Sequence, residues 1–296
     1  MTEQTEQTNK HSLALGLCVK NNAIGLPKCF ENISKLRTLF DKFMIVIYYD
    51  NSNDNSLRIC IELTKKYDLK TVVMNSNCKN PVTNIRTVDI ANARNNILKY
   101  VYIEECNDYN LFGMMDTNKY SCQGDIKIDV IEKYLNDETM FDKWDSLTFA
   151  REPYYDIWAF SNDAFQLGCW SYPKDVMDSY SSSYTVESYQ NKLIQYIKNT
   201  LLSEENKGKL LPVDSAFCGF GLYKKDIFKG CVYNGYFTDK YIDKELLKKN
   251  LEKYPLKRVN TIVDCEHRHF HMMAKRLNNA KIMVACDQAF TYFYSY

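Results

Sequence analysis

The sequence predicts an α/β protein with a mostly parallel central sheet flanked by helices, followed by a less regular α+β portion. In the first half, short apolar runs of strand length alternate with segments whose apolar residues recur at helical spacing. Helices placed between successive apolar strands imply a parallel sheet with both faces covered. With 296 residues, 45% of them hydrophobic, the chain can bury the core of one large domain or two small ones.

The predicted elements alternate most regularly in the first half of the chain. The β-branched and aromatic run at 43–49 ends in the polar cluster 50–54, which suits a loop and a helix N-cap. The run at 109–115 leads directly into Asp116. The expected order is strand 12–19, helix 24–40, strand 43–49, helix 56–67, strand 70–74, helix 89–102 and strand 109–115.

The second half has a weaker alternation, with aromatic residues and glycines between its apolar runs. The elements expected there are a strand at 146–150, an aromatic segment at 154–165, a polar loop that passes into a helix at 181–202, strands at 217–223 and 229–236, helices at 240–254 and 267–278, and a strand at 281–286.

Composition excludes several classes of protein. Lys+Arg number 38 and Asp+Glu 37, so the net charge of +1 gives no general electrostatic basis for binding nucleic acid or a membrane surface. No apolar run approaches the roughly 20 residues that span a bilayer, and residues 1–11 form a polar tail without the apolar core of a signal peptide. The 11 cysteines occur singly, which favours reduced thiols. We therefore expect a soluble, cytoplasmic protein.

The first candidate site is Asp116-Thr117-Asn118, at the end of an apolar run. In an open parallel sheet, ligands gather beyond the carboxyl ends of the strands, where Asp50 also falls. A carboxylate on a sharp turn, with a second oxygen donor two residues later, can hold a hard divalent cation beside a diphosphate. The alternative is a simple Asx-turn, because Asp and Asn are common where strands end.

The second candidate site is the cluster Cys265-Glu266-His267-Arg268-His269-Phe270-His271, which holds three of the four histidines. A helix would place His267 and His271 on one face, whereas an extended segment would add His269 and Cys265 to that face. Imidazoles suit Zn, Mn or Fe, and Glu266 is a candidate general base. The alternative is one structural histidine at a helix start, with the others solvated. No H-E-x-x-H motif supports a metalloprotease.

Two further segments combine a carboxylate with glycines or aromatic residues. In the segment 214–221, the glycines at 219 and 221 allow the backbone to approach a ligand, or they serve tight strand packing. In the segment 154–160 (YYDIWAF), aromatic faces beside an acid suit a sugar ring, or they belong to the core. No G-x-G-x-x-G, G-K-[ST] or G-x-S-x-G motif is present, which argues against dinucleotide, phosphate-loop and serine-hydrolase chemistry.

Taken together and in order, these segments resemble a GT-A glycosyltransferase, a nucleotide-diphospho-sugar transferase of the kind found in large DNA viruses and in fungal capsule-mannosyltransferase relatives. The resemblance covers about residues 12–290 and implies a single Rossmann-like GT-A domain, with a nucleotide-sugar-binding half at 12–120 and an acceptor-binding half at 121–296. The motifs that carry it are Ala93-Arg94-Asn95, Asp116-Thr117-Asn118 at the D-x-D position, YYDIWAF at 154–160, DSAFCGFGLYK at 214–224, and CEH at 265–267 followed by Lys275-Arg276-Leu277.

The resemblance implies transfer of a sugar from a UDP- or GDP-sugar, UDP being favoured, to a hydroxyl of a glycan or protein-linked sugar, with Mn²⁺ or Mg²⁺. It places metal ligands at Asp116 and Asn118, with His269 or His271 as a further ligand, and candidate bases at Glu266, which is favoured, His267 and Asp214. Nucleotide-sugar contacts would come from Val19, Lys20, Asn21, Asp50, Arg94 and Thr117, and acceptor contacts from Tyr154, Asp156, Trp158, Gly219, Phe220 and Gly221. In this scheme Arg94 faces the diphosphate or the donor sugar.

Two departures from the family pattern leave other functions open. Asn118 replaces the second carboxylate of D-x-D, which weakens metal binding, and His267 replaces the Asp of the family's x-E-D motif. Both suggest, as an alternative, a catalytically decayed module that binds a sugar or nucleotide. A third hypothesis is a metal-dependent hydrolase or nucleotidyltransferase that uses the histidine cluster. The sequence leaves the stereochemistry open, and a retaining enzyme requires no base.

Overall fold

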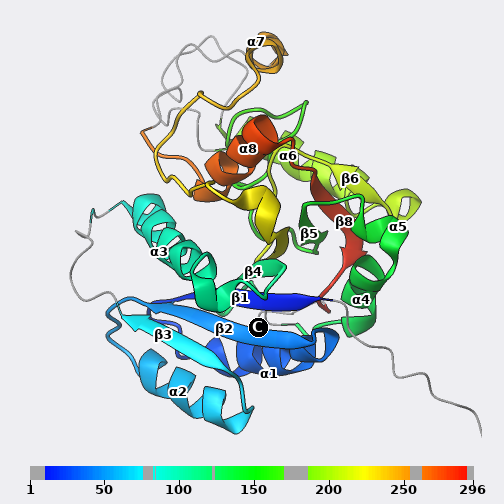
Figure 1. Ribbon diagram of the computed structural model, residues 1–296. Helices are drawn as coiled ribbons and strands as arrows, with labels where there is room; N and C mark the ends of the chain where they lie inside the picture. The colour runs from blue at the N-terminus through cyan, green and yellow to red at the C-terminus, as the bar shows by residue number, and fades with distance from the viewer. Residues whose placement is uncertain are drawn as a thin grey trace, which may run out of the picture.

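One mixed sheet runs through the described part of the chain in the computed structural model, which covers residues 11–75, 83, 85–121, 124–169, 186–253 and 262–291 (Figure 1). Its eight strands are β1 (Ser12–Val19), β2 (Lys42–Tyr49), β3 (Thr71–Asn75), β4 (Leu111–Asp116), β5 (Ser146–Ala150), β6 (Leu210–Pro212), β7 (Phe220–Lys224) and β8 (Ile282–Gln288). They lie in the order β3-β2-β1-β4-β7-β5-β8-β6. β1 to β4 are parallel, as are β5 and β8, whereas β7 and β6 are antiparallel to their neighbours. The predicted α/β class with a mostly parallel sheet is confirmed.

Helices cover both faces of the first four strands. The helices are α1 (Leu26–Leu36), α2 (Ser56–Lys66), α3 (Arg86–Val101), α4 (Ile128–Asn136), α5 (Glu138–Phe141), α6 (Val186–Thr200), α7 (Lys244–Lys253) and α8 (Glu266–Asn278). In Figure 1, α1 and α2 lie below the sheet and α3 lies above it. The side chains of β1 alternate accordingly: Leu13 and Leu15 join the core cluster of Phe30 in α1, whereas Ala14 joins the cluster of Ile97 in α3.

The segment 229–236 is predicted as a strand, and this prediction is wrong, because the segment lies along α3 instead of joining the sheet. The Asn95 side chain replaces a neighbouring strand: its Nδ2 donates to the Tyr233 carbonyl at 2.9 Å, and its Oδ1 accepts from the Tyr233 N–H at 2.8 Å. Thr87 Oγ1 donates to the Gly235 carbonyl at 2.9 Å. A Cβ on Gly235 would lie 2.3 Å from the Thr87 backbone, so only glycine allows this close approach.

The remaining differences concern boundaries and short elements. The helix expected at 24–40 is α1 followed by a 3₁₀ turn at Arg37–Leu39. β6 and α5 are missing from the predicted order because three and four residues are too few for a periodic pattern. α4 does carry a helical spacing, with Ile131, Tyr134 and Leu135 buried on one face. The polar tail at 1–10 and the predicted loop at 181–185 lie outside the described residues.

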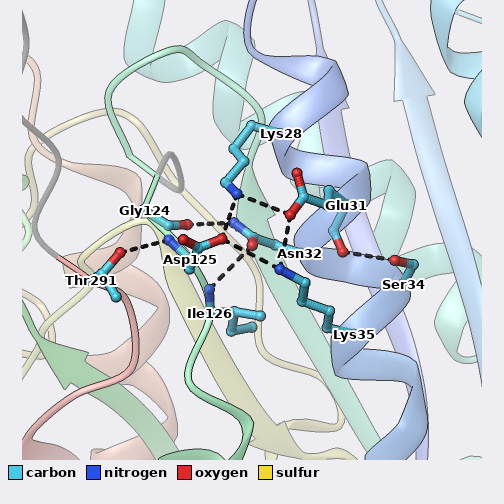
Figure 2. A network of polar contacts seen from close by, with 9 residues as sticks. All are labelled: Lys28, Glu31, Asn32, Ser34, Lys35, Gly124, Asp125, Ile126 and Thr291. Atoms are coloured by element: carbon cyan, nitrogen blue, oxygen red, sulfur yellow. Dashed lines mark hydrogen bonds and ion pairs between the residues drawn. The ribbon is translucent and has the colours of Figure 1, made fainter.

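A polar network fastens α1 to two segments from later in the chain (Figure 2). Asn32 is fully buried, donates from Nδ2 to the Gly124 carbonyl at 2.8 Å and accepts at Oδ1 from the Ile126 N–H at 3.2 Å. Asp125 accepts from Lys28 at 2.6 Å, and its backbone N–H donates to Thr291 Oγ1 at 2.8 Å. Residues 124–126, which follow β4 in the chain, are therefore bound to α1 and to the segment that follows β8.

The described residues include no helix that is both long and apolar enough to cross a membrane. All nine cysteines in the same part of the chain are free thiols, and eight of them are buried. Buried thiols behave as small apolar side chains, so here they contribute to packing.

Candidate active site

The carboxyl ends of β1, β2 and β4 lie side by side at one edge of the sheet. Val19 is in register with Tyr49, and Cys18 is in register with Asp116, so the chain leaves the three strands at the same level. Open parallel sheets bind ligands at this edge. Most of the residues that the sequence assigns to a nucleotide sugar lie on the loops that begin here.

The loops after β1 and β2 are joined by polar contacts. Lys20 Nζ lies 2.6 Å from Asp50 Oδ2 in an exposed ion pair. Asn21 adopts a left-handed backbone conformation (φ 51°), which asparagine tolerates better than most residues. Its N–H donates to Ser52 Oγ at 3.0 Å, and its Oδ1 accepts from the Asn53 N–H at 2.7 Å. The structure thus brings Lys20, Asn21 and Asp50 together at the edge of the sheet, as expected.

Two other residues predicted to contact the nucleotide have buried side chains. Val19 is 1% exposed and belongs to the core cluster below the sheet. Thr117 is 1% exposed, its Oγ1 donates to the Cys18 carbonyl at 2.9 Å, and it contacts the Asn22 amide. A Cβ on Gly25 would lie 2.3 Å from the Thr117 carbonyl. These side chains hold the loops after β1 and β4 against each other, and the nucleotide contacts expected of Val19 and Thr117 remain predictions.

The turn after β4 is the Asx-turn that the sequence left open. Asn118 Oδ1 accepts from the backbone N–H groups of Tyr120 at 2.8 Å and Ser121 at 3.0 Å. Its Nδ2 donates to Tyr155 Oη at 2.8 Å. The amide of Asn118 therefore shapes the turn and connects it to the aromatic segment.

A buried arginine joins Asp116 to the start of α8. Arg94, on α3, is 5% exposed, and its Nη2 donates to Asp116 Oδ1 at 3.0 Å. Its Nε lies 3.5 Å from Glu266 Oε1, and its Nη1 lies 3.3 Å from His267 Nδ1. One guanidinium between two carboxylates leaves one negative charge on this cluster. Residues distant in the sequence thus meet at the carboxyl end of β4.

Burial changes the acidity of the carboxyl groups around Arg94. Burial raises the pKa of Asp116 above its ordinary value, while the charge of Arg94 opposes this rise and that of Glu266 adds to it. Asp156, which is partly exposed, has a pKa raised to about 7, first by burial and then by the charges of Glu266 and Asp116. Asp156 therefore belongs to the same electrostatic cluster, and it changes charge near neutral pH.

The three clustered histidines do not form one site. His267 is 1% exposed, and burial, Arg94 and His271 lower its pKa well below the ordinary value. Arg94 can only donate, so His267 Nδ1 accepts and the ring proton lies on Nε2, which favours Glu266 over His267 as a base. His271 is fully buried, 3.0 Å from Ser215 Oγ and 3.3 Å from Tyr223 Oη, and burial lowers its pKa to about 3.

The side chain of His269 lies on the face of α8 opposite to His267. Two residues along a helix turn a side chain by about 200°, so His269 faces away from His267 and packs edge-on against Tyr241 at 5.1 Å. Burial lowers its pKa to about 4. The structure does not bring His269 to Asp116, which corrects the expectation that it supplies a metal ligand there. Of the three histidines only His267 and His271 share a face, with ring centroids 5.6 Å apart, so a hydrolase or nucleotidyltransferase built on the cluster would have to use these two.

Asp214, the third candidate base, also lies apart from the Arg94 cluster. Its carboxylate forms an ion pair with Lys275 and accepts from Gln166 Nε2 at 2.6 Å. It lines a separate cavity of about 170 Å³ with Tyr241, Met272 and other residues of α7 and α8. Because both of its oxygens have partners on that side of α8, the structure favours Glu266 over Asp214.

The aromatic segment at 154–160 contributes to both the site and the core. Tyr155 is bonded to Asn118, and Asp156 Oδ1 accepts from the Ala159 N–H at 3.1 Å. Tyr154 packs edge-on against Phe160 with its ring 6.2 Å away. Trp158 packs against the same core cluster, and a Cβ on Gly168 would lie 3.2 Å from its ring. Sugar contacts of Tyr154 and Trp158 remain predictions, because both aromatic rings are partly used in packing.

The glycine segment has different roles at each of its three predicted positions. Gly219 has φ 85°, a conformation that favours glycine, and its carbonyl accepts from the Asp116 N–H at 2.8 Å. Phe220 is 1% exposed and stacks on Phe149 at 6.0 Å, so its predicted acceptor contact is wrong. Gly221 lies in β7 between β4 and β5, where a Cβ would be 3.1 Å from Tyr223 Oη, so it serves the alternative role of tight strand packing.

Two aromatic residues enclose Arg94 and were not assigned to the site from the sequence. The rings of Phe217 and Tyr233 lie 4.9 Å and 5.7 Å from the guanidinium carbon, within the range of cation–π attraction. Phe217 lies in the segment 214–221, which its glycines mark as a candidate site in the sequence. No sequence pattern marks Tyr233 as a site residue, because the run around it resembles a strand.

The donor set around Asp116 fits a divalent cation that takes most of its ligands from a substrate. Asp116 uses Oδ1 for Arg94, and Asn118 uses Oδ1 for two backbone N–H groups. No group of three or more His, Cys, Asp or Glu side chains in the described part of the chain is placed to hold a metal ion. Mg²⁺ is often held by one or two carboxylates with phosphate oxygens and water. Such an ion would need the phosphates of a nucleotide here.

Comparison with known proteins finds no matching family model and no matching curated protein. Solved structures with partial similarity include TarS of S. aureus, with a TM-score of 0.45 and 14% identity over 94% of this chain and 36% of TarS. TarS 1–349 in complex with UDP-GlcNAc has a TM-score of 0.46 and 13% identity, over 94% of this chain and 57% of that one. The mannosyltransferase PcManGT from Pyrobaculum calidifontis, in complex with GDP-Man and Mn²⁺, has a TM-score of 0.44 and 10% identity, over 94% and 58%.

This chain thus spans between about a third and three fifths of the length of these proteins. Similarity at this level assigns no function by itself.

Proposed function

We propose that this chain is a GT-A-type glycosyltransferase that moves a sugar from a UDP- or GDP-sugar to a hydroxyl acceptor with Mn²⁺ or Mg²⁺. The observation that carries the proposal is the meeting of Asp116 and Glu266 on Arg94 at the ligand-binding edge of the sheet. A carboxylate for a metal–diphosphate group and a second carboxylate for proton removal are the two acidic functions that this reaction needs.

The two halves of the chain have separate tasks in this proposal. Residues 12–120 bind the nucleotide sugar through the loops that carry Lys20, Asn21 and Asp50, which are joined at the edge of the sheet. Residues 121–296 supply the acceptor side, with Asp156 and Glu266 beside Asp116. The near-neutral net charge of the chain is compatible with a small anionic ligand that is neutralised by a local cation.

Two carboxylates have separate roles in the proposed reaction: Asp116 holds the metal ion and Glu266 removes a proton. Asp116 would hold Mn²⁺ or Mg²⁺, and the ion, when bound, offsets the charge that develops on the departing diphosphate. Glu266 takes the proton of the acceptor hydroxyl. At the same time the hydroxyl oxygen bonds to the anomeric carbon of the donor sugar, and the bond from that carbon to the diphosphate breaks. This role of Glu266 belongs to an inverting reaction, and a retaining reaction needs no such base.

A second candidate function is a decayed module that binds a nucleotide sugar without transferring it. The observation in its favour is that Asn118 uses its amide in the Asx-turn and offers no second carboxylate. The two functions differ in turnover and share donor binding.

The experiment is a thermal-shift panel of UDP- and GDP-sugars with Mn²⁺ and Mg²⁺, followed by detection of released UDP or GDP with saccharide acceptors. We expect one sugar nucleotide to raise the melting temperature only when metal is present, and Asp116→Ala to abolish the effect. Donor binding without turnover on any acceptor would favour the decayed module. No binding of any nucleotide sugar would contradict both functions.

A further inference from the structure

The environment of Arg94 differs from that of an arginine that binds phosphate. Its side chain is 6% exposed. Three of its nitrogens face protein partners: Nη2 lies 3.0 Å from Asp116, Nη1 lies 3.3 Å from His267, and Nε lies 3.5 Å from Glu266. A guanidinium carries five N–H donors in one plane, and each of its three nitrogens lies within 3.5 Å of a protein partner.

Two aromatic rings also lie close to the same guanidinium. The ring of Phe217 lies 4.9 Å from its central carbon and the ring of Tyr233 lies 5.7 Å from it. Phe217 is fully buried and Tyr233 is 2% exposed. A diphosphate has no open approach to a group with this surrounding, because ligand atoms would have to displace a carboxylate or an aromatic ring.

The partners of Arg94 come from elements that no other close ion pair among the described residues connects. Asp116 ends β4, Glu266 begins α8, and Arg94 lies in the middle of α3. A guanidinium presents its N–H donors in one rigid plane, so a single arginine on α3 reaches both carboxylates and fixes their spacing.

We propose that Arg94 is a positioning residue: Asp116 anchors its guanidinium, which holds Glu266 in its working orientation, and Arg94 does not bind the donor diphosphate. The inference rests on the proposed function for its kinetic test. It replaces the donor contact that the family resemblance implies for Arg94. Lysine at this position keeps the charge, but a single ammonium cannot reproduce the planar fork that reaches three partners.

The test compares Arg94→Lys with a control, Lys99→Arg, at an exposed cation in the last turn of the same helix. UDP or GDP affinity is measured by calorimetry with Mn²⁺, and kcat is measured with the donor found in the panel above. We expect Arg94→Lys to lower kcat at least about 100-fold, the effect of misplacing a catalytic group, while nucleotide affinity changes less than about threefold. Lys99→Arg should keep both quantities near those of the wild type.

A double-mutant cycle with Glu266→Gln separates positioning from a general structural effect. If Arg94 acts through Glu266, Arg94→Lys should lower kcat little further once Glu266 is already Gln, so the two effects are far from additive. Additive effects, or a nucleotide affinity that falls more than about tenfold in Arg94→Lys, would overturn the inference and restore Arg94 as a donor ligand.

Two further measurements keep the test decisive. If Arg94→Lys unfolds, Glu266→Gln and Asp116→Asn are compared alone and together for stability, since carboxylates that share one guanidinium must show non-additive unfolding free energies. Additive values would overturn the inference in that case as well. A wild-type chain without turnover on any acceptor contradicts the proposed function, and the affinity and stability measurements then still decide the role of Arg94.

Discussion

Replacement of Asp156 by Asn should stabilise the protein at neutral and alkaline pH. The Asp156 carboxyl has a pKa raised to about 7 in the folded chain, first by burial and then by Glu266 and Asp116, against an ordinary value of 3.8. Between these values the unfolded chain has released the proton and the folded chain has kept it. Since the folded state binds more protons, the free energy of unfolding falls as pH rises from about 4 to about 7.

The size of this effect follows from the change in pKa. A rise from 3.8 to about 7 sets a ceiling of about 4 kcal/mol at about 1.4 kcal/mol for each pH unit. Because the side chain is partly exposed, solvent screening reduces the expected effect to about 1–2 kcal/mol. Asn keeps the oxygen that accepts from the Ala159 N–H and removes the charge.

The assay is urea denaturation of the wild type and Asp156→Asn at pH 4 and pH 8, in buffer with a chelator. We expect the variant to gain about 1–2 kcal/mol relative to wild type between the two pH values. Asp163→Asn, at an exposed acid of the same loop, is the matched control and should show no such gain. An Asp156→Asn variant whose relative stability is the same at both pH values would refute the raised pKa of Asp156.

Three further predictions test the packing and the metal requirement. Asn32→Ala leaves two buried backbone groups unsatisfied and should lower the free energy of unfolding by about 2–3 kcal/mol. The control Lys35→Ala, at the exposed rim of the network in Figure 2, should lower it by less than about 1 kcal/mol. Equal losses in the two variants would contradict this account. Phe220→Ala should cost about 3–5 kcal/mol in urea denaturation, as expected for a core residue and not for an acceptor contact, whereas a loss below about 1 kcal/mol would return Phe220 to the surface of the site. Mn²⁺ should bind measurably in calorimetry only with UDP or GDP present, because Asp116 supplies a single carboxylate; tight binding of Mn²⁺ alone would show a complete protein site.

The sheet could be predicted from the sequence because its strands are short apolar runs bounded by polar turns. The boundaries of β1 and β5 match the expected 12–19 and 146–150, since both strands are buried over nearly their whole length. The failure at 229–236 has a physical cause: side chains at 231–236 alternate between buried and less buried positions as in a strand, but the Asn95 side chain bonds the Tyr233 backbone in place of a neighbouring strand. Sequence periodicity reports burial and extension, and it does not report which neighbour supplies the hydrogen bonds.

The candidate site was predictable in part for a similar reason. Asp116 and Asp50 follow apolar strands, so their place at the edge of the sheet follows from strand direction. The histidine cluster could be predicted only as two alternatives, because a helix places His267 and His271 on one face and an extended segment adds His269 to it; α8 corresponds to the first. The contacts of Arg94 with Glu266 depend on the approach of α3 to α8, which local sequence does not encode.

The most direct test of the central claim is donor turnover by wild type, Asp116→Ala and Glu266→Gln, measured as UDP or GDP released with the best acceptor in the presence of Mn²⁺. The account predicts release by the wild type that stops when the metal is chelated. Asp116→Ala should lose donor binding and turnover together, whereas Glu266→Gln should keep donor binding and lose turnover by about 100-fold or more. A wild type that binds no nucleotide sugar, or an Asp116→Ala variant with unchanged turnover, would contradict the account.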